Sequence, residues 1–111
     1  MTAPQLVKVD DGQYRLTGEI VFSVVATLAD RPLDDNGGAC HVALDTLERA
    51  DSSVLALLLR WLRRERRRGI TLTFSGFSDQ LLSLIDLYDL EPILLELQQE
   101  GGNAVEIRKP L

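Results

Sequence analysis

Apolar residues recur at intervals of three and four between positions 53 and 67. This spacing is typical of an amphipathic helix, because residues three or four positions apart lie on the same helical face. The helix is expected to end at Gly69, where glycine is favoured after a helix C-terminus. The helix would pack on a sheet through one apolar stripe, which consists of Leu55, Leu58, Leu59 and Leu62.

A second apolar stripe on the flank of the same helix consists of Val54, Leu57 and Trp61. A surface helix needs only one buried stripe, so the second must be covered by a neighbouring helix or by a partner protein. Trp61 is the only tryptophan of the chain, and tryptophan is enriched at interface hot spots. Both interpretations stay open, and the second makes these three residues candidate partner contacts.

Several short segments have the composition of β-strands. Residues 6–9 and 13–17 flank the turn sequence Asp10-Asp11-Gly12 and predict a hairpin at a sheet edge. Residues 39–44 are almost all apolar, which is typical of a central strand buried on both faces. Residues 70–74 predict another buried strand.

The rest of the chain predicts further helices over residues 22–31 and 78–88 and a loop over residues 45–51. A weaker tail would hold a short helix within residues 90–100 and an edge strand at 105–107. Strands that alternate with helices imply right-handed crossovers and parallel pairing. The predicted fold class is therefore α/β, with a mixed, mostly parallel sheet and helices packed on it.

The length of 111 residues fits one domain, and hydrophobic residues make up 45% of the chain. Cys40 is the only cysteine and His41 the only histidine, so neither an intrachain disulfide nor a Cys/His zinc site within one chain can form. Both residues lie in the predicted strand 39–44, where we expect core positions and an inert thiol.

No constellation for catalysis is found in the sequence. It contains neither a glycine-rich phosphate loop nor a Ser/His/Asp arrangement around a nucleophile elbow. We therefore predict no catalytic residue, no metal site and no cofactor, and a protein that is not an enzyme.

The charge is distributed unevenly along the chain. A formal net charge of −5 argues against binding to nucleic acid, yet the segment 60–68 holds six arginines and one glutamate. Cations near a helix C-terminus stabilise the helix dipole, so a solvated face explains most of them. The same run could also attract an acidic partner or anionic lipid headgroups.

No apolar stretch approaches the roughly 20 residues needed to span a bilayer, and residues 1–6 lack the features of a signal peptide. We therefore expect a cytoplasmic protein without a membrane span, which could still sit on a membrane complex.

The sequence Asp51-Ser52-Ser53 precedes the main helix. Short oxygen-bearing side chains at this place satisfy the free backbone N–H groups of the first helical turn, so either Asp51 or Ser52 is expected to cap the helix. A capping role alone would explain the motif, and a role in partner binding is the other interpretation.

Residues 42–45 and 50–55 resemble the signature of STAS domains, in which a buried strand ends in Asp and an Asp-Ser motif opens the next helix. The likeness extends over about residues 5–100. Within the family, residues 55–59 and 87–90 look most like the Mla-type subgroup found with bacterial phospholipid-transporting ABC complexes.

This resemblance implies a non-enzymatic, cytoplasmic subunit, peripheral to an inner-membrane transporter, that supports the assembly and activity of this transporter. The transporter in turn would maintain outer-membrane lipid asymmetry. The partner of this chain would be the ATPase subunit, with the permease in the same complex. The interface would include Asp51, Ser52 and Ser53, and the helix 53–67 would be the docking element with Val54, Leu57 and Trp61 as contacts.

The alternative within the family is an anti-sigma-factor antagonist, in which a partner kinase phosphorylates the serine that matches Ser52. The family motif usually has glycine where this chain has Val54. A valine would narrow the approach of a partner backbone, which favours a standing interface over a reversible switch.

Overall fold

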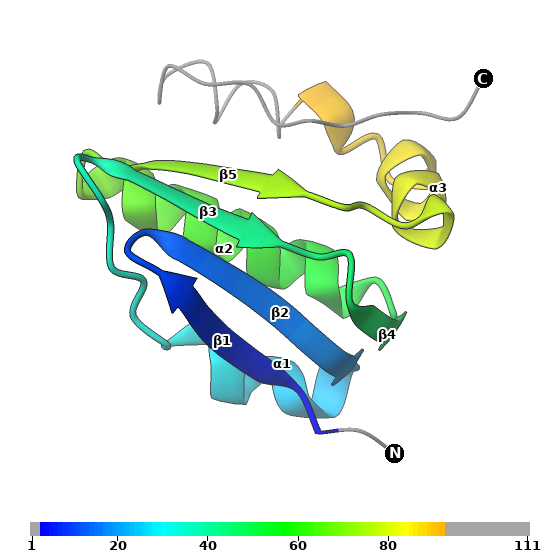
Figure 1. The fold of residues 1–111 in the computed structure, drawn as a ribbon. Coiled ribbons are helices and arrows are strands. Elements are labelled where there is room, and N and C mark those ends of the chain that lie inside the picture. Colours follow the sequence, from blue (N-terminus) through cyan, green and yellow to red (C-terminus); the bar gives the residue numbers. More distant parts are fainter. Residues whose placement is uncertain (1–2, 93–111) are drawn as a thin grey trace.

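The computed structural model describes residues 3–92. The chain forms five strands and three helices in the order β1 (Gln5–Asp10), β2 (Gln13–Ile20), α1 (Phe22–Ala29), β3 (Ala39–Ala43), β4 (Leu47–Ala50), α2 (Ser53–Arg67), β5 (Thr71–Ser75) and α3 (Asp79–Leu87) (Figure 1). The predicted hairpin and the main helix are confirmed, and the helix has the predicted bounds. The first helix ends two residues earlier than predicted, because Asp30 already leaves the helical conformation.

The strands form one mixed sheet with the order β1-β2-β3-β5, and β4 also pairs with β2. Strand β1 runs antiparallel to β2, whereas the β2–β3, β2–β4 and β3–β5 pairs are parallel. The predicted α/β class with a mostly parallel sheet is confirmed.

Strand β4 corrects the prediction of a loop over residues 45–51. It pairs with the C-terminal half of β2, where Ile20 lies opposite Ala50, while β3 pairs with the N-terminal half. Glu48 and Arg49 are exposed and only Ala50 is buried, so the segment has no alternating pattern that would indicate a strand. Its strand character comes from the free edge of β2.

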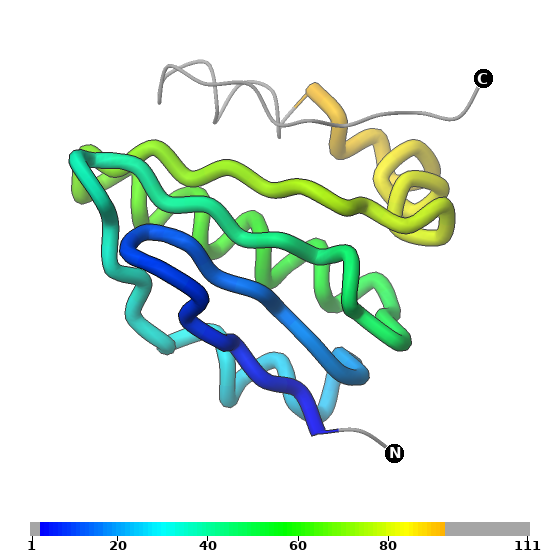
Figure 2. Tube along the Cα trace, in the orientation of Figure 1, coloured from blue at the N-terminus to red at the C-terminus, as the bar shows by residue number. Residues whose placement is uncertain are grey.

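Helices α1 and α2 lie on one face of the sheet (Figure 1). The core between helices and sheet is built mainly from aliphatic side chains, and its largest fully buried members are Trp61 and Phe74. The connection from α1 to β3 passes close to the turn between β1 and β2 (Figure 2), where Lys8 forms an ion pair of 3.3 Å with Asp34. In the same region the hydroxyl of buried Tyr14 accepts a hydrogen bond of 2.9 Å from the Asp34 backbone N–H.

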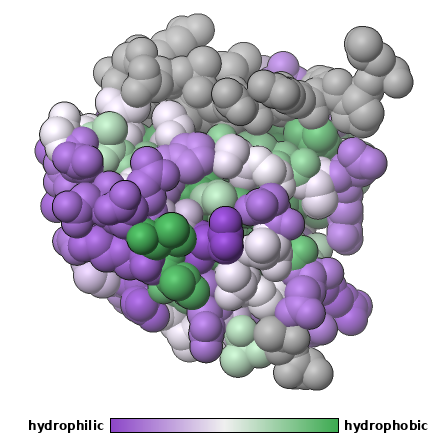
Figure 3. Space-filling model, in the orientation of Figure 1, coloured by the Kyte–Doolittle hydropathy of each residue, from purple (hydrophilic) through white to green (hydrophobic). Residues whose placement is uncertain are grey.

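The face of β3 that points away from the helices is only partly buried, so the prediction that β3 is buried on both faces was wrong. Cys40 and Val42 are buried against the helices, whereas His41 is half-buried on the opposite face. Its ring nitrogens lie 2.7 Å from the Thr73 hydroxyl and 2.8 Å from the Ser75 hydroxyl. His41 is therefore part of a polar cluster and not of the core, and the exposed surface in this view is largely hydrophilic (Figure 3).

The predicted tail can be compared with the structure only at its beginning. Helix α3 ends at Leu87, and a helical turn includes residues 91 and 92. The rest of the helix predicted within 90–100 and the strand predicted at 105–107 lie outside the described residues.

Candidate functional site

The turn that leads into α2 is organised by the carboxylate of Asp51. Its Oδ1 accepts a hydrogen bond of 2.9 Å from the backbone N–H of Ser53 and a second from the Ser53 hydroxyl. Its Oδ2 accepts a hydrogen bond of 3.2 Å from the backbone N–H of Phe22, the first residue of α1. One side chain therefore caps two helices that begin 31 residues apart in the sequence.

These contacts lower the pKa of Asp51 below its ordinary value. The largest cause is the hydrogen bond from the Ser53 hydroxyl, and backbone N–H groups of Ser53 and Phe22 and the nearby Arg49 act in the same direction. The positive ends of two helix dipoles also favour a carboxylate at this place. The turn therefore keeps a fixed negative charge at neutral pH.

Ser52 is exposed at the start of α2, and its side chain makes no capping hydrogen bond. The sequence left open whether Asp51 or Ser52 caps the helix, and the structure assigns that role to Asp51. The Ser52 hydroxyl is therefore not needed to satisfy the helix, so it is free to meet a partner or to be modified.

Phe22 stands beside this turn and is 83% exposed, the largest exposure among the large hydrophobic residues described. Its backbone is fixed by Asp51, so the ring projects from a defined position. Phe22 was not among the candidate residues predicted from the sequence, because the first helix was expected to pack on the sheet. A signal was present, since the segment from Phe22 to Ala29 is too apolar for one helix face, and only Leu28 and Ala29 are buried.

The structure does not place Val54, Leu57 and Trp61 on a surface that faces a partner. Their exposed fractions are 0%, 1% and 0%, because α2 packs against the sheet and against α1. The interpretation in which this stripe is covered within the domain is therefore the one observed, and the partner-contact interpretation is corrected for Val54 and Trp61. Leu57 is also buried, but it borders the groove between α1 and α2. Since the side chain of Val54 is buried, it does not narrow the approach of a partner either.

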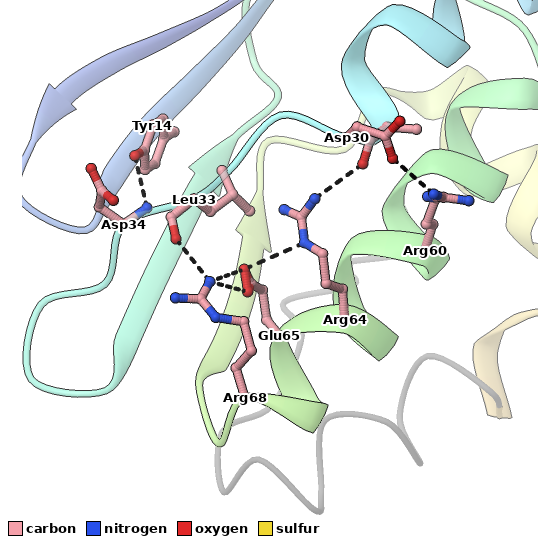
Figure 4. Close-up of polar contacts among 9 residues, drawn as sticks. Tyr14, Asp30, Leu33, Asp34, Arg60, Arg64, Glu65 and Arg68 are labelled. Carbon is pink, nitrogen blue, oxygen red and sulfur yellow. Dashed lines mark hydrogen bonds and ion pairs between the residues drawn. The ribbon is translucent and has the colours of Figure 1, made fainter.

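Three arginines of the run make polar contacts within the domain (Figure 4). Glu65 is fully buried, and both of its carboxylate oxygens accept hydrogen bonds from Arg68, at 2.9 and 2.8 Å. Arg68 also donates to the Leu33 carbonyl at 3.3 Å. A buried carboxylate needs such pairing to offset its desolvation, so this part of the run has a structural role.

Two more arginines join α2 to the end of α1. Arg64 donates to the Ala29 carbonyl at 3.1 Å, and Arg60 forms an ion pair of 2.9 Å with Asp30 (Figure 4). The prediction that most of the run is solvated therefore applies best to Arg63 and Arg67, which are exposed.

A groove of about 940 Å³ runs between α1 and α2. Its lining includes Phe22 and Ser53 at the Asp51 turn and continues along α2 to Arg67. The exposed Ser52, the projecting Phe22 ring and this groove therefore form one continuous surface at the paired helix starts.

Within residues 3–92 no group of three or more His, Cys, Asp or Glu side chains is arranged to hold a metal ion. Cys40 is buried, and burial raises the pKa of its thiol to about 11, with the charge of Glu65 as a smaller cause. A thiol with this pKa is a poor nucleophile at neutral pH. Among the same residues, no helix combines the length and the apolar character that crossing a bilayer requires.

A small α/β fold whose exposed chemistry is a turn, an aromatic ring and a helical groove has the features of an interaction domain. A scan against known protein families matches residues 8–96 to the family described as "Mlab, STAS domain". The chain belongs to the STAS family, whose members act in protein–protein interaction and are generally non-catalytic. A search of curated proteins gave no match.

Proposed function

We propose that this chain is a non-enzymatic, cytoplasmic STAS subunit that binds the ATPase of a phospholipid-transporting ABC complex and supports its assembly and activity. In this role it would contribute to outer-membrane lipid asymmetry. The observation that carries the proposal is the exposed Ser52 turn with the projecting Phe22 beside it, because this surface is both accessible and rigidly held.

The Mla-type resemblance supports the transporter role over other STAS roles. The family match carries the Mlab description over residues 8–96. The segment 87–90, which resembles the same subgroup, includes two exposed hydrophobic residues at the end of α3, Leu87 at 72% and Tyr88 at 53%. Exposed apolar side chains of this size are expected where a stable partner covers them.

The second candidate function is an anti-sigma-factor antagonist that is switched by phosphorylation of Ser52. The exposed hydroxyl favours it, and the burial of Val54 removes the steric objection raised from the sequence. The fixed charge of Asp51 opposes it, because a phosphate on Ser52 would stand next to a carboxylate that already accepts a hydrogen bond from the backbone N–H of Ser53, and the two negative groups would repel each other.

The test is an affinity purification of the tagged protein from its own cells in mild detergent, with the partners identified by mass spectrometry. Recovery of an ABC ATPase together with its permease supports the transporter subunit. Recovery of a kinase that phosphorylates Ser52, without transporter subunits, contradicts it and supports the switch.

A further inference from the structure

The groove between α1 and α2 extends well beyond the Ser52 turn. Its α1 wall includes Phe22, Ser23 and Ala26, and its α2 wall includes Ser53 and Ala56. Small side chains form much of the lining, so a second backbone can approach the two helices closely. Apolar lining of this kind fits the apolar face of a helix.

The charged part of the lining has one dominant sign. Four arginines of α2 line the groove, and among the described lining residues Asp30 is the only carboxylate. Asp30 is already paired with Arg60 at 2.9 Å. Within residues 3–92 no ion pair joins Arg63 or Arg67 to a carboxylate, so two exposed cations remain unneutralised in a chain with a net charge of −5.

The groove follows the whole of α2, which has 15 residues and is therefore about 22 Å long. A helix of three to four turns has the length to lie along it. Apolar positions at helical spacing would meet the small and apolar side chains of the lining, and acidic positions on the flank would meet Arg63 and Arg67.

We infer that the α1–α2 groove binds an acidic amphipathic helix of the partner protein. The inference rests on the proposed function in one respect, since it takes the protein that contacts the Ser52 turn to be the one that fills the groove. It adds the chemistry of the bound segment, namely one apolar face flanked by Asp and Glu. Charge complementarity favours this occupant over a second copy of the acidic chain.

Photo-crosslinking tests the inference on the intact protein in its own cells. A photoreactive amino acid replaces exposed Ala26 in the groove, and the control carries it at Val9, which is 60% exposed on β1. The expected result is an adduct from position 26, and not from position 9, to a partner segment with apolar residues at helical spacing and a net negative charge.

Charge reversal supplies the second readout. Arg63→Glu and Arg67→Glu, each alone, are expected to lower the adduct yield about threefold to tenfold and to weaken its dependence on salt. The matched control is Arg15→Glu, which reverses an exposed arginine on β2 outside the groove and should leave the yield unchanged.

Three results would overturn the inference. These are an adduct to a neutral or basic segment, an adduct between two copies of this chain, and no protein adduct combined with arginine-dependent binding to vesicles of phosphatidylglycerol, which would assign the groove to a membrane surface. Failure of the proposed function is distinguishable. An adduct to an acidic helix of a protein other than the ABC ATPase would support the groove inference and refute the transporter role. Copurification of the ATPase without any adduct would support the transporter role and refute the groove inference.

Discussion

The carboxylate of Asp51 accepts a hydrogen bond of 3.2 Å from the backbone N–H of Phe22, across 29 positions of the sequence. The same carboxylate accepts a hydrogen bond of 2.9 Å from the backbone N–H of Ser53, the first residue of α2. This relationship fixes the starts of both helices together and presents Ser52 and the Phe22 ring on one surface. The integrity of the candidate site is therefore linked to a single side chain.

Asp51→Asn is expected to lower the free energy of unfolding at pH 7 by about 1 kcal/mol, because it removes a negative charge that interacts favourably with two helix starts. Ser52→Ala is the matched control and should leave stability nearly unchanged, since the Ser52 side chain makes no capping bond. Urea denaturation of the three proteins measures both effects. If Ser52→Ala lost as much stability as Asp51→Asn, the assignment of the cap to Asp51 would be wrong.

The same comparison has a defined pH dependence. The pKa of Asp51 is lower in the folded protein than the ordinary value of 3.8, so the stabilisation is complete above about pH 5 and is lost as pH falls through the folded-state pKa. The difference in unfolding free energy between the wild type and Asp51→Asn should therefore narrow between about pH 5 and pH 2. A difference that stays constant over this range would contradict the lowered pKa.

Trp61→Ala is expected to destabilise the fold by about 3–5 kcal/mol, because it leaves a large cavity in the core. Trp61→Phe should cost less, since it fills most of that space and removes an indole N–H that is buried without a partner among the described residues. A Trp61→Ala protein with wild-type stability and weakened partner binding would show that Trp61 belongs to the interface.

Phe22→Ala, at a side chain that is 83% exposed, should change stability by less than about 0.5 kcal/mol and still reduce partner recovery.

The close packing of Gly76, in the loop that leads into α3, can be tested by alanine substitution. Gly69, in the connection between α2 and β5, serves as the matched control. Both have positive φ, 77° and 75°, so alanine at either position is strained by about 1 kcal/mol. A Cβ at Gly76 would also lie 2.6 Å from the backbone nitrogen of Asp45, whereas a Cβ at Gly69 meets nothing within 4 Å. Thermal and urea unfolding should show Gly76→Ala to be less stable than Gly69→Ala by about 1–3 kcal/mol. Equal losses would mean that the Asp45 loop yields without cost.

Much of the fold could be predicted from the sequence where a local pattern decides the structure. The helix from Ser53 to Arg67 has continuous apolar periodicity and a glycine after its end, and the β1–β2 hairpin has a turn sequence between two β-prone runs. Strand β4 could not be predicted, because its pairing with β2 comes from the tertiary arrangement.

The site could be predicted only in part for the same reason. The Asp51-Ser52-Ser53 motif is visible in the sequence, but the hydrogen bond from Asp51 to the start of α1 is not. Periodicity shows that α2 has two apolar stripes without showing whether the domain or a partner covers the second, so the burial of Trp61 stayed open. The exposure of Phe22 depends on how α1 packs, and no linear pattern singled it out. Burial of Glu65 likewise depends on Arg68 and on the Leu33 carbonyl, which no linear pattern brings together.

The role of the Ser52 turn as the partner surface is tested most directly by the amount of ABC ATPase recovered with three tagged versions of the protein: the wild type, Ser52→Asp and Gln13→Glu. Gln13→Glu adds the same charge at an exposed residue at the opposite end of β2 from the α2 start. If the Ser52 turn is the partner surface, Ser52→Asp should reduce recovery about tenfold or more, because it places a charge in a contact that loses its water, while Gln13→Glu recovers as much as the wild type. Equal recovery with all three versions would contradict the assignment of the interface to this turn.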